Sequence, residues 1–165
     1  MSAPVSLRPM RWWDVEAAYT LEVQLFSPDT WSVETFWSEL AADGRCYLVA
    51  EADCAAENVG TVALLGYAGL AVNGSQADVQ TVAVSPHAQG RGVGRLLLGA
   101  LVAEAASRGA TSLLLEVRAD NEAARALYTR TGFERIAVRR KYYQPGDIDA
   151  HVMRLRPLTA FGGTR

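Results

Sequence analysis

Apolar side chains recur with helical spacing in the first quarter of the chain. The spacing predicts helices over Trp12 to Leu25 and from Ser32, a good N-cap residue, to the break at Asp43-Gly44. A short apolar run, Val5 to Leu7, can begin a sheet before them, and the loop Phe26-Ser-Pro-Asp-Thr-Trp31 connects the two helices. The chain therefore starts with one short strand and two helices.

From Cys46 to Val84 the pattern changes to β-branched and aromatic runs that turn residues interrupt. The runs cover residues 46–52, 59–72 and 77–84. Asn73-Gly74, between the second run and the third, is a strong hairpin signal. This segment therefore predicts an antiparallel sheet.

The second half of the chain alternates between helical and strand patterns. One helix is predicted to end at Gly109, and the run Ser112 to Val117 follows as a buried strand. Asp120 or Asn121 can cap a short helix that ends at Gly132. The apolar positions of the first helix are Val93, Leu96, Leu97, Ala100 and Leu101, and those of the second include Ala124, Leu127 and Tyr128.

Two strands close the chain, over Glu134 to Tyr143 and Ile148 to Leu155, joined by the turn Gln144-Pro-Gly-Asp147. The whole order predicts an α/β (α+β) fold with a mixed, mostly antiparallel central sheet flanked by helices. With 165 residues, half of them apolar, the chain can bury one core. We expect a single domain over residues 1–158 and a flexible tail over residues 159–165.

The formal net charge of −2 limits the classes of partner. Lys141 is the only lysine among sixteen basic residues, and a mildly acidic chain lacks the broad positive field that non-specific nucleic-acid binding needs. We therefore expect no direct nucleic-acid partner. The cluster Arg139-Arg140-Lys141 is the exception, either as a solvated strand edge or as a contact for the substrate.

The sequence predicts neither a membrane segment nor a metal site. No stretch approaches the ~20 apolar residues that span a bilayer, and the N-terminus lacks a signal-peptide pattern, so we expect a cytoplasmic protein without a membrane partner. Cys46 and Cys54 cannot build a disulfide framework or a four-ligand zinc site. His87 and His151 have no partner at metal-ligand spacing.

The most specific motif is a glycine-rich loop between the strand that ends at Val84 and the next helix. Glycine lets the backbone approach a ligand closely, and the free N–H groups of a helix N-terminus favour an anionic phosphate. Two arginines add positive charge. The loop predicts a pyrophosphate site, the simpler alternative being a turn that only starts a helix. Its residues are Gln89, Gly90, Arg91, Gly92, Val93, Gly94 and Arg95.

Two other phosphate-binding motifs fit less well. A P-loop requires G-x-x-x-x-G-K-[ST], and Lys141 lies far downstream of the glycines. A dinucleotide-binding fold is a better rival, because Glu116 follows Gly94 by 116 − 94 = 22 residues, near the spacing of its ribose-binding carboxylate. Yet these glycines run G-x-G-x-G, Ser85 to Gln89 separate them from the strand, and the first half of the sheet is antiparallel.

The loop and the segments after it resemble the acetyl-CoA-binding region of the GNAT superfamily. Gln89-x-x-Gly92-x-Gly94 is similar to the Q/R-x-x-G-x-G/A signature with which that superfamily binds the pyrophosphate of acetyl-CoA. The resemblance extends roughly from Val79 to Phe133 and implies the GNAT fold, with acetyl-CoA as co-substrate. The further motifs, in order, are Leu115-Glu-Val-Arg118, Asn121-x-x-Ala124-x-x-Leu127-Tyr128 and Gly132-Phe133.

Within that superfamily the chain resembles the RimI-type N-terminal acetyltransferases. Residues 139–143, residues 146–150 and Met153 resemble their closing hairpin, and Trp31-Ser32 resembles the loop after their first helix, where Pro usually stands in place of Thr30. The resemblance implies that the acceptor is a protein or peptide N-terminus, in particular the N-terminal alanine of a ribosomal small-subunit protein. A small-molecule amine acetyltransferase and a non-catalytic module that binds coenzyme A are the alternatives.

Acetyl transfer to an amine needs a neutral amine and a proton for the departing thiolate. The resemblance implies that Glu116 is the general base, and we expect the apolar flanks of its strand to make the carboxylate a better base. It implies that Tyr128 is the general acid, since a phenol stays protonated until charge develops nearby. Alternatively, Glu116 faces solvent or pairs with Arg118, and Tyr128 only packs its helix.

Further residues are expected to bind the donor. Asn121 can hydrogen-bond the pantetheine arm of acetyl-CoA or cap its helix, or do both. The backbone of Val82, Ala83 and Val84 should offer N–H and C=O groups to the same arm. One of those N–H groups can also serve the oxyanion that forms during transfer.

Three aromatic residues are expected to bind the acceptor: Trp31, Tyr142 and Tyr143. Tyrosine hydroxyls can hydrogen-bond the backbone of an incoming peptide. Because adjacent strand residues point to opposite faces, only one of the two tyrosines faces the peptide unless a bulge intervenes.

Overall fold

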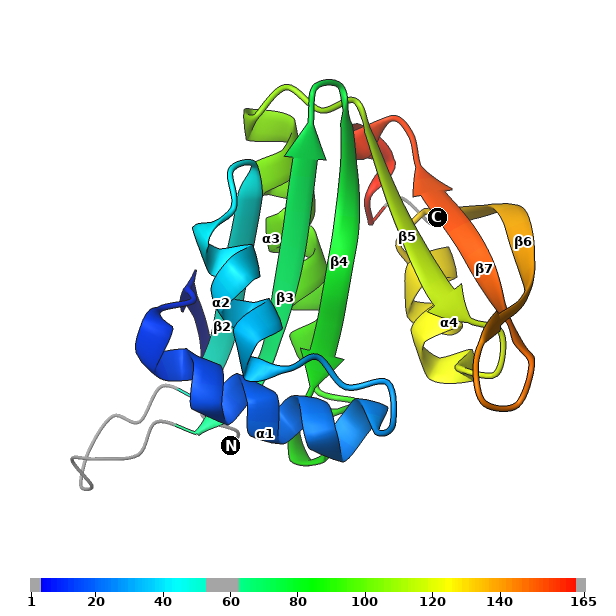
Figure 1. Cartoon of the computed structure of the whole chain (residues 1–165). Coiled ribbons are helices and arrows are strands. Elements are labelled where there is room, and N and C mark those ends of the chain that lie inside the picture. Colours follow the sequence, from blue (N-terminus) through cyan, green and yellow to red (C-terminus); the bar gives the residue numbers. More distant parts are fainter. Residues whose placement is uncertain (1–3, 53–62, 163–165) are drawn as a thin grey trace. The chain divides into compact units, whose positions relative to one another are not determined.

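The structure is a computed structural model that describes residues 4–52 and 63–162 (Figure 1). Seven strands form a sheet in the order β1-β2-β3-β4-β5-β7-β6. The chain divides into two compact units, the first made of residues 1–70 and 81–101 and the second of residues 71–80 and 102–165. This mixed α/β arrangement agrees with the fold class that the order of patterns predicts.

The bounds of the closing hairpin and of the two helices in the second half of the chain agree with the sequence pattern. Residues 53–62, which include Cys54 and the start of one predicted strand, lie outside the described residues. The strands are β1 (Val5–Pro9), β2 (Arg45–Ala52), β3 (Leu64–Asn73), β4 (Gln76–Val84), β5 (Ser112–Arg118), β6 (Glu134–Tyr143) and β7 (Ile148–Leu155). The helices are α1 (Val15–Phe26), α2 (Val33–Ala41), α3 (Val93–Ser107) and α4 (Glu122–Arg130), with short 3-10 helices η1 (Trp12–Asp14), η2 (Pro86–Ala88) and η3 (Leu158–Ala160).

In the first unit, α1 and α2 lie over one face of strands β2 and β3 (Figure 1). β1 pairs with β2 in antiparallel register, with Leu7 opposite Ala50. Helix α2 starts as predicted, because the Ser32 hydroxyl oxygen accepts a hydrogen bond from the Thr35 amide at 3.1 Å. The apolar cluster between helices and strands consists of Met10, Val15, Ala18, Leu21, Phe36, Tyr47, Val49, Tyr67 and Ala83.

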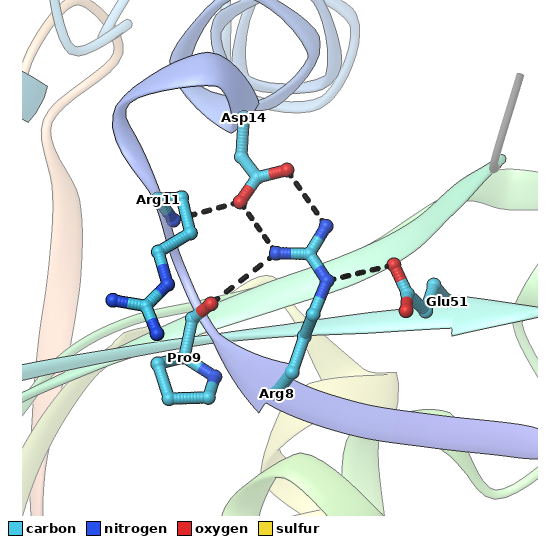
Figure 2. A network of polar contacts seen from close by, with 5 residues as sticks. All are labelled: Arg8, Pro9, Arg11, Asp14 and Glu51. Atoms are coloured by element: carbon cyan, nitrogen blue, oxygen red, sulfur yellow. Dashed lines mark hydrogen bonds and ion pairs between the residues drawn. The ribbon is translucent and has the colours of Figure 1, made fainter. Parts of the chain in front are cut away.

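Helix α1 begins later than predicted, because Trp12 to Asp14 form the 3-10 helix η1. The guanidinium of Arg8 donates to both carboxylate oxygens of Asp14, at 2.7 and 2.9 Å, and to Glu51 at 2.9 Å (Figure 2). Burial alone raises the pKa of Asp14, but the hydrogen bonds from Arg8 and from the Arg11 amide outweigh it and lower the pKa. The network fixes the entry to α1 and leaves the two tryptophans of η1 exposed.

Two glycines of β3 allow their neighbours to pack closely. A Cβ atom at Gly69 would lie 2.2 Å from the ring of Tyr47, and one at Gly66 would lie 2.4 Å from the carbonyl oxygen of Ala83. No side chain fits at either position without displacing these atoms. The glycines that interrupt the apolar pattern of this strand are therefore packing positions.

In the second unit, the start of β4 pairs in parallel with β5, with Gln76 opposite Ser112. Parallel neighbours need a crossover connection, which α3 provides. β5 pairs antiparallel with β7, and β7 pairs antiparallel with β6. Strand β6 is the edge of the sheet, and every residue of it except Tyr143 is exposed.

The last described residues, up to Gly162, pack against the end of α4. Thr131 is fully buried, and its hydroxyl donates to two carbonyls of that helix. Gly132 has φ +103°, and a Cβ atom there would lie 2.7 Å from the carbonyl oxygen of Ala160. The Gly162 amide donates to the carbonyl of Thr131 at 3.1 Å. The segment expected to be a tail from Thr159 is thus hydrogen-bonded to the second unit as far as Gly162.

Candidate functional site

The glycine-rich loop joins β4 to α3 in the first unit. The side-chain amide of Gln89 donates to the carbonyl of Val84 at 3.2 Å, which ties the loop to the end of the strand. Gly90 and Gly92 have φ values of +73° and +82°, and a Cβ atom at either position would meet no described atom within 4 Å. The backbone conformation, and not crowding, therefore favours glycine here, and the loop is open to a ligand.

The N-terminus of α3 presents amides without intrahelical acceptors. The Leu96 amide donates to the carbonyl of Gly92 at 3.0 Å, and the amides of Val93 to Arg95 precede this first helical hydrogen bond. Arg91 and Arg95 are exposed, and within the described chain neither forms an ion pair. Amides, helix dipole and two cations together suit a diphosphate.

Val82, Ala83 and Val84 form the end of β4 beside this loop. Ala83 is buried and its two neighbours are half-buried. Among the described residues, the pairing of β4 with β5 covers Gln76 to Asp78, at the opposite end of the strand. Residues 82–84 thus form the part of β4 that leads into the glycine-rich loop.

Trp31 lies in the loop between α1 and α2, also in the first unit. Its ring is half-buried and packs edge-on against Phe36 and Tyr47, with ring centroids 5.5 and 6.2 Å apart. Its amide donates to the Glu22 carboxylate at 3.1 Å. Trp31, which is predicted to contact the acceptor, is therefore held by a hydrogen bond from its backbone and by aromatic contacts of its ring.

Glu116 lies on the outer face of β5 in the second unit. Leu115 and Val117 are buried whereas Glu116 is exposed, so the predicted buried strand is buried on the face opposite Glu116. The carboxylate pairs with the guanidinium of Arg139 on β6 at 3.0 Å, and the Glu116 side chain is 31% exposed. The guanidinium of Arg139, rather than an apolar surrounding, thus faces the Glu116 carboxylate.

Tyr128 is buried on α4, with its ring centroid 5.8 Å from that of Phe133. Burial, with a smaller contribution from nearby Tyr143, raises the pKa of Tyr128 to about 12. The buried Tyr128 ring is therefore a packing residue of its helix, which agrees with the alternative interpretation given above. It is also a phenol that stays protonated at neutral pH, as a general acid requires.

Tyr142 and Tyr143 lie beside a bulge at the end of β6. The pairing of β6 with β7 shifts register between Arg139 and Tyr143, and Lys141 has φ +51°. The two tyrosine rings consequently meet edge to face, with centroids 5.1 Å apart. The guanidinium of Arg139 lies 5.5 Å from the centroid of the Tyr142 ring. Glu116, Arg139 and both tyrosines are thus contiguous in the second unit.

Asn121 is the N-cap of α4, which confirms one of the two roles predicted for it. Its side-chain oxygen accepts a hydrogen bond from the Ala124 amide at 3.1 Å. The preceding Asp120 does not cap the helix but pairs with Arg118 at 3.0 Å. Because Asn121 is exposed, its amide nitrogen can still donate to a ligand.

The basic cluster at residues 139–141 combines a surface edge with one contact to Glu116. Arg140 pairs with Asp149 at 3.5 Å and Lys141 with Asp147 at 3.4 Å, and both cations are largely exposed. Exposed pairs of this kind contribute about 0–1 kcal/mol each. Arg139 is the member of the cluster whose ion pair involves a predicted site residue.

A hollow of about 840 Å³ opens on the second unit between α4 and the strands β6 and β7. Its lining includes Arg125, Arg130, Arg135 and His151. Burial, and then the charges of Arg125 and Arg135, lower the pKa of His151. None of the predicted site residues lines this hollow, so it is separate from the candidate site.

Residues of the described chain form no metal-binding cluster and no membrane-spanning helix. Histidine, cysteine and acidic side chains do not gather there in groups of three that could hold a metal ion. No helix within residues 4–52 or 63–162 is both long and apolar enough to cross a bilayer.

Comparison with known proteins identifies the family. The Acetyltransferase (GNAT) family matches residues 10–133. The chain is 43% identical over 147 residues to an uncharacterized protein of Mycobacterium leprae, covering 86% of this chain but only 38% of that protein's length. It is 40% identical over 156 residues to the N-alpha-acetyltransferase RimI of Mycobacterium tuberculosis, and the match covers 92% of each chain.

Structural similarity agrees with the sequence relationship. The crystal structure of the ribosomal-protein-S18-alanine N-acetyltransferase from Escherichia coli superposes with a TM-score of 0.78 and 33% identity. The superposition covers 93% of this chain and 94% of that one. With a family match over most of its length and relatives of this similarity, the chain belongs to the Acetyltransferase (GNAT) family.

Proposed function

We propose that this protein transfers the acetyl group of acetyl-CoA to the α-amine of a protein N-terminus, with the N-terminal alanine of a ribosomal small-subunit protein as the preferred acceptor. The similarity to RimI of M. tuberculosis, which extends over 92% of both chains, carries this proposal. The name of the E. coli enzyme, 38% identical over 144 residues, specifies alanine of ribosomal protein bS18 as its substrate. A ribosomal acceptor would place the reaction in the cytoplasm.

The glycine-rich loop is the proposed site for the pyrophosphate of acetyl-CoA. Its open positive-φ glycines, the free amides of α3 and the cations of Arg91 and Arg95 all fit a diphosphate. Residues 82–84 would hold the pantetheine arm through their backbone, and the exposed amide of Asn121 would donate to it. Acetyl-CoA supplies an activated acetyl thioester. The neutral amine would attack its carbonyl carbon to form the new C–N bond, and the C–S bond would break to release the CoA thiolate. The protein would take one proton from the amine and give one to the thiolate.

Glu116 is the proposed general base. A free α-amine has a pKa near 8, so a modest preference for the neutral form suffices, and the carboxylate can accept the proton through a water molecule. The ion pair with Arg139 keeps the carboxylate oriented in the absence of substrate. The arriving ammonium group is a second cation, which can compete with Arg139 for Glu116 before it loses its proton.

Tyr128 is the proposed general acid. Its phenol donates the proton that the departing thiolate takes up, because burial keeps the phenol protonated while charge develops on sulfur. A thiol near pKa 8.5 is a stronger acid than this phenol, so the transfer relies on proximity rather than on a favourable difference in pKa. The buried ring environment provides that fixed position.

Trp31, Tyr142 and Tyr143 are the proposed acceptor-binding residues. The bulge in β6 places the two tyrosine rings in contact, so both can lie on the same side of the hairpin. Their hydroxyls can bond the first peptide groups of a flexible chain end. An internal lysine, with a pKa near 10.4, is harder to deprotonate by about two orders of magnitude than the terminal amine.

A single peptide tests the acceptor. The peptide begins with alanine, follows a ribosomal-protein N-terminus and contains one internal lysine. We expect one acetyl group at the first residue, located by tandem mass spectrometry, and none on a copy whose N-terminus is blocked. Acetylation of the blocked copy at lysine, or reaction only with small polyamines, would favour the small-molecule alternative. Binding of acetyl-CoA without turnover of any amine would favour a non-catalytic module.

A further inference from the structure

Helix α1 carries a buried carboxyl group to which the proposed reaction assigns no role. Glu22 is 2% exposed and lies beside the apolar cluster of the first unit. Burying an acidic side chain is costly unless donors compensate for the lost water. A carboxyl group at this depth therefore needs specific partners, and those partners indicate what it does.

Each oxygen of Glu22 accepts one hydrogen bond. Oε2 accepts from the hydroxyl of Tyr67 on β3, and Oε1 accepts from the Trp31 amide at 3.1 Å. Burial raises the pKa of Glu22, and these two hydrogen bonds only partly offset the effect. Glu22 thus links three elements: α1, the central strand β3 and the loop that carries Trp31.

The partners of Glu22 are themselves packed together. The Phe36 ring lies 5.6 Å from that of Tyr67 and 5.5 Å from that of Trp31, measured between centroids. Tyr67 and Phe36 are fully buried, so neither ring can shift without opening the core. The Trp31 ring is held by the core aromatics, and its backbone is held by the carboxyl group. Loss of the carboxyl group would free the backbone of Trp31 while the aromatic contacts remained.

We propose that Glu22 is a positioning residue that fixes the Trp31 loop and thereby sets the affinity for the acceptor. The inference rests on the proposed function, in which Trp31 contacts the acceptor. The glycine-rich loop, which would bind acetyl-CoA, makes no hydrogen bond with Glu22 among the described residues. Removal of the carboxyl group should therefore change acceptor binding and leave donor binding unchanged.

Two variants separate the hydrogen bonds that the Glu22 carboxyl group accepts from the volume that its side chain fills. Glu22→Leu keeps a buried side chain of similar size and removes both acceptor oxygens. Glu22→Gln keeps one oxygen for the Trp31 amide, while its NH₂ group can donate to the Tyr67 hydroxyl. With the alanine peptide we expect Glu22→Leu to raise KM at least tenfold while kcat changes less than threefold. Glu22→Gln should restore most of the loss.

Hydrogen exchange provides a readout that needs no substrate. We expect the Trp31 amide to exchange at least tenfold faster in Glu22→Leu than in the wild type, and the core strands to be unchanged. Glu34→Leu, which removes an exposed acid from α2, is the matched control and should leave exchange and KM unchanged. If Glu22→Leu fails to fold, Tyr67→Phe removes one of the two donors and should raise KM in the same direction by a smaller factor.

Three outcomes would overturn the inference: an unchanged KM, an unchanged Trp31 exchange rate, or a parallel loss of acetyl-CoA affinity measured by calorimetry. The last of these would indicate a general structural role. If the wild type acetylates only a small amine, the proposed function fails, and KM for that amine in the same variants still decides the role of Glu22.

Discussion

Replacing Tyr128 by phenylalanine isolates the proposed general acid. The ring remains available for the contact with Phe133, so the variant should fold, and only the phenolic proton is lost. A positioned acid contributes on the order of 10²-fold or more to a rate, so kcat should fall by at least that factor while acetyl-CoA affinity stays the same. Turnover under conditions where chemistry is rate-limiting, together with calorimetry, measures both quantities.

The raised pKa of Tyr128 also predicts how pH affects the two proteins. With a pKa of about 12 in place of 10.0, roughly one phenol in 10⁴ is ionised at pH 8. Ionisation of Tyr128 therefore cannot produce a decline in kcat below about pH 11, and the pH profile of the Phe variant should have the wild-type shape at lower amplitude. If kcat of the wild type fell with a midpoint below pH 10 and kcat of the Phe variant did not, the effect of burial described here would be contradicted.

The change of the unfolding free energy with pH gives an independent check of the raised pKa of Tyr128. Because the folded-state pKa lies above the unfolded value, the contribution of the neutral phenol is fully present below pH 10 and is lost as pH rises from 10 to about 12. The shift corresponds to about 3 kcal/mol. The wild type should lose up to that much unfolding free energy relative to Tyr128→Phe over this range, as measured by urea denaturation. Parallel stability curves for the two proteins would refute the reasoning.

Three further predictions test the remaining assignments. Arg91→Glu should weaken acetyl-CoA binding by roughly tenfold or more without unfolding, and an unchanged calorimetric affinity would remove the pyrophosphate assignment. Glu116→Gln should lower turnover by about 10²-fold. Arg139→Gln breaks the same ion pair but keeps the carboxylate, so an equal loss in that control would indicate the ion pair itself. Gly132→Ala should destabilise the fold by about 1–3 kcal/mol in thermal unfolding, and more than Gly74→Ala, which has a positive φ but open space around it.

Local patterns predicted the elements of this fold well because local chemistry determines them. The caps at Ser32 and Asn121 accept the hydrogen bonds that their positions predict. The helix start at Val15 was missed, because it depends on an ion pair between Arg8 and Asp14 that joins a strand to the turn. Leu96, at an apolar helical position of α3, is 43% exposed, since periodicity alone does not determine how wide a buried face is.

The candidate site was predicted in its residue types and only partly in its contacts. The partner of Glu116 is Arg139, which lies on a strand 23 residues further along the chain (139 − 116), and strand pairing of this kind has no local signal. Glu22 did have one. It stands one residue after Leu21 and four after Ala18, on the apolar side of α1, where a charged residue is unexpected. The register shift in β6 that brings Tyr142 and Tyr143 together depends on the pairing with β7 and could not be predicted.

The last residues of the chain have a practical bearing on how the protein can be shortened or tagged. A deletion that began at Thr159 would remove the residues that contact Thr131 and Gly132. These two residues lie at the end of the helix that carries Tyr128. A protease acting on the exposed Thr159 would have the same effect. A tag is best added after Gly162, because sequence added there leaves the hydrogen bond from the Gly162 amide to Thr131 in place. Shortening the chain before residue 163 is therefore expected to loosen the end of the helix that carries the proposed general acid.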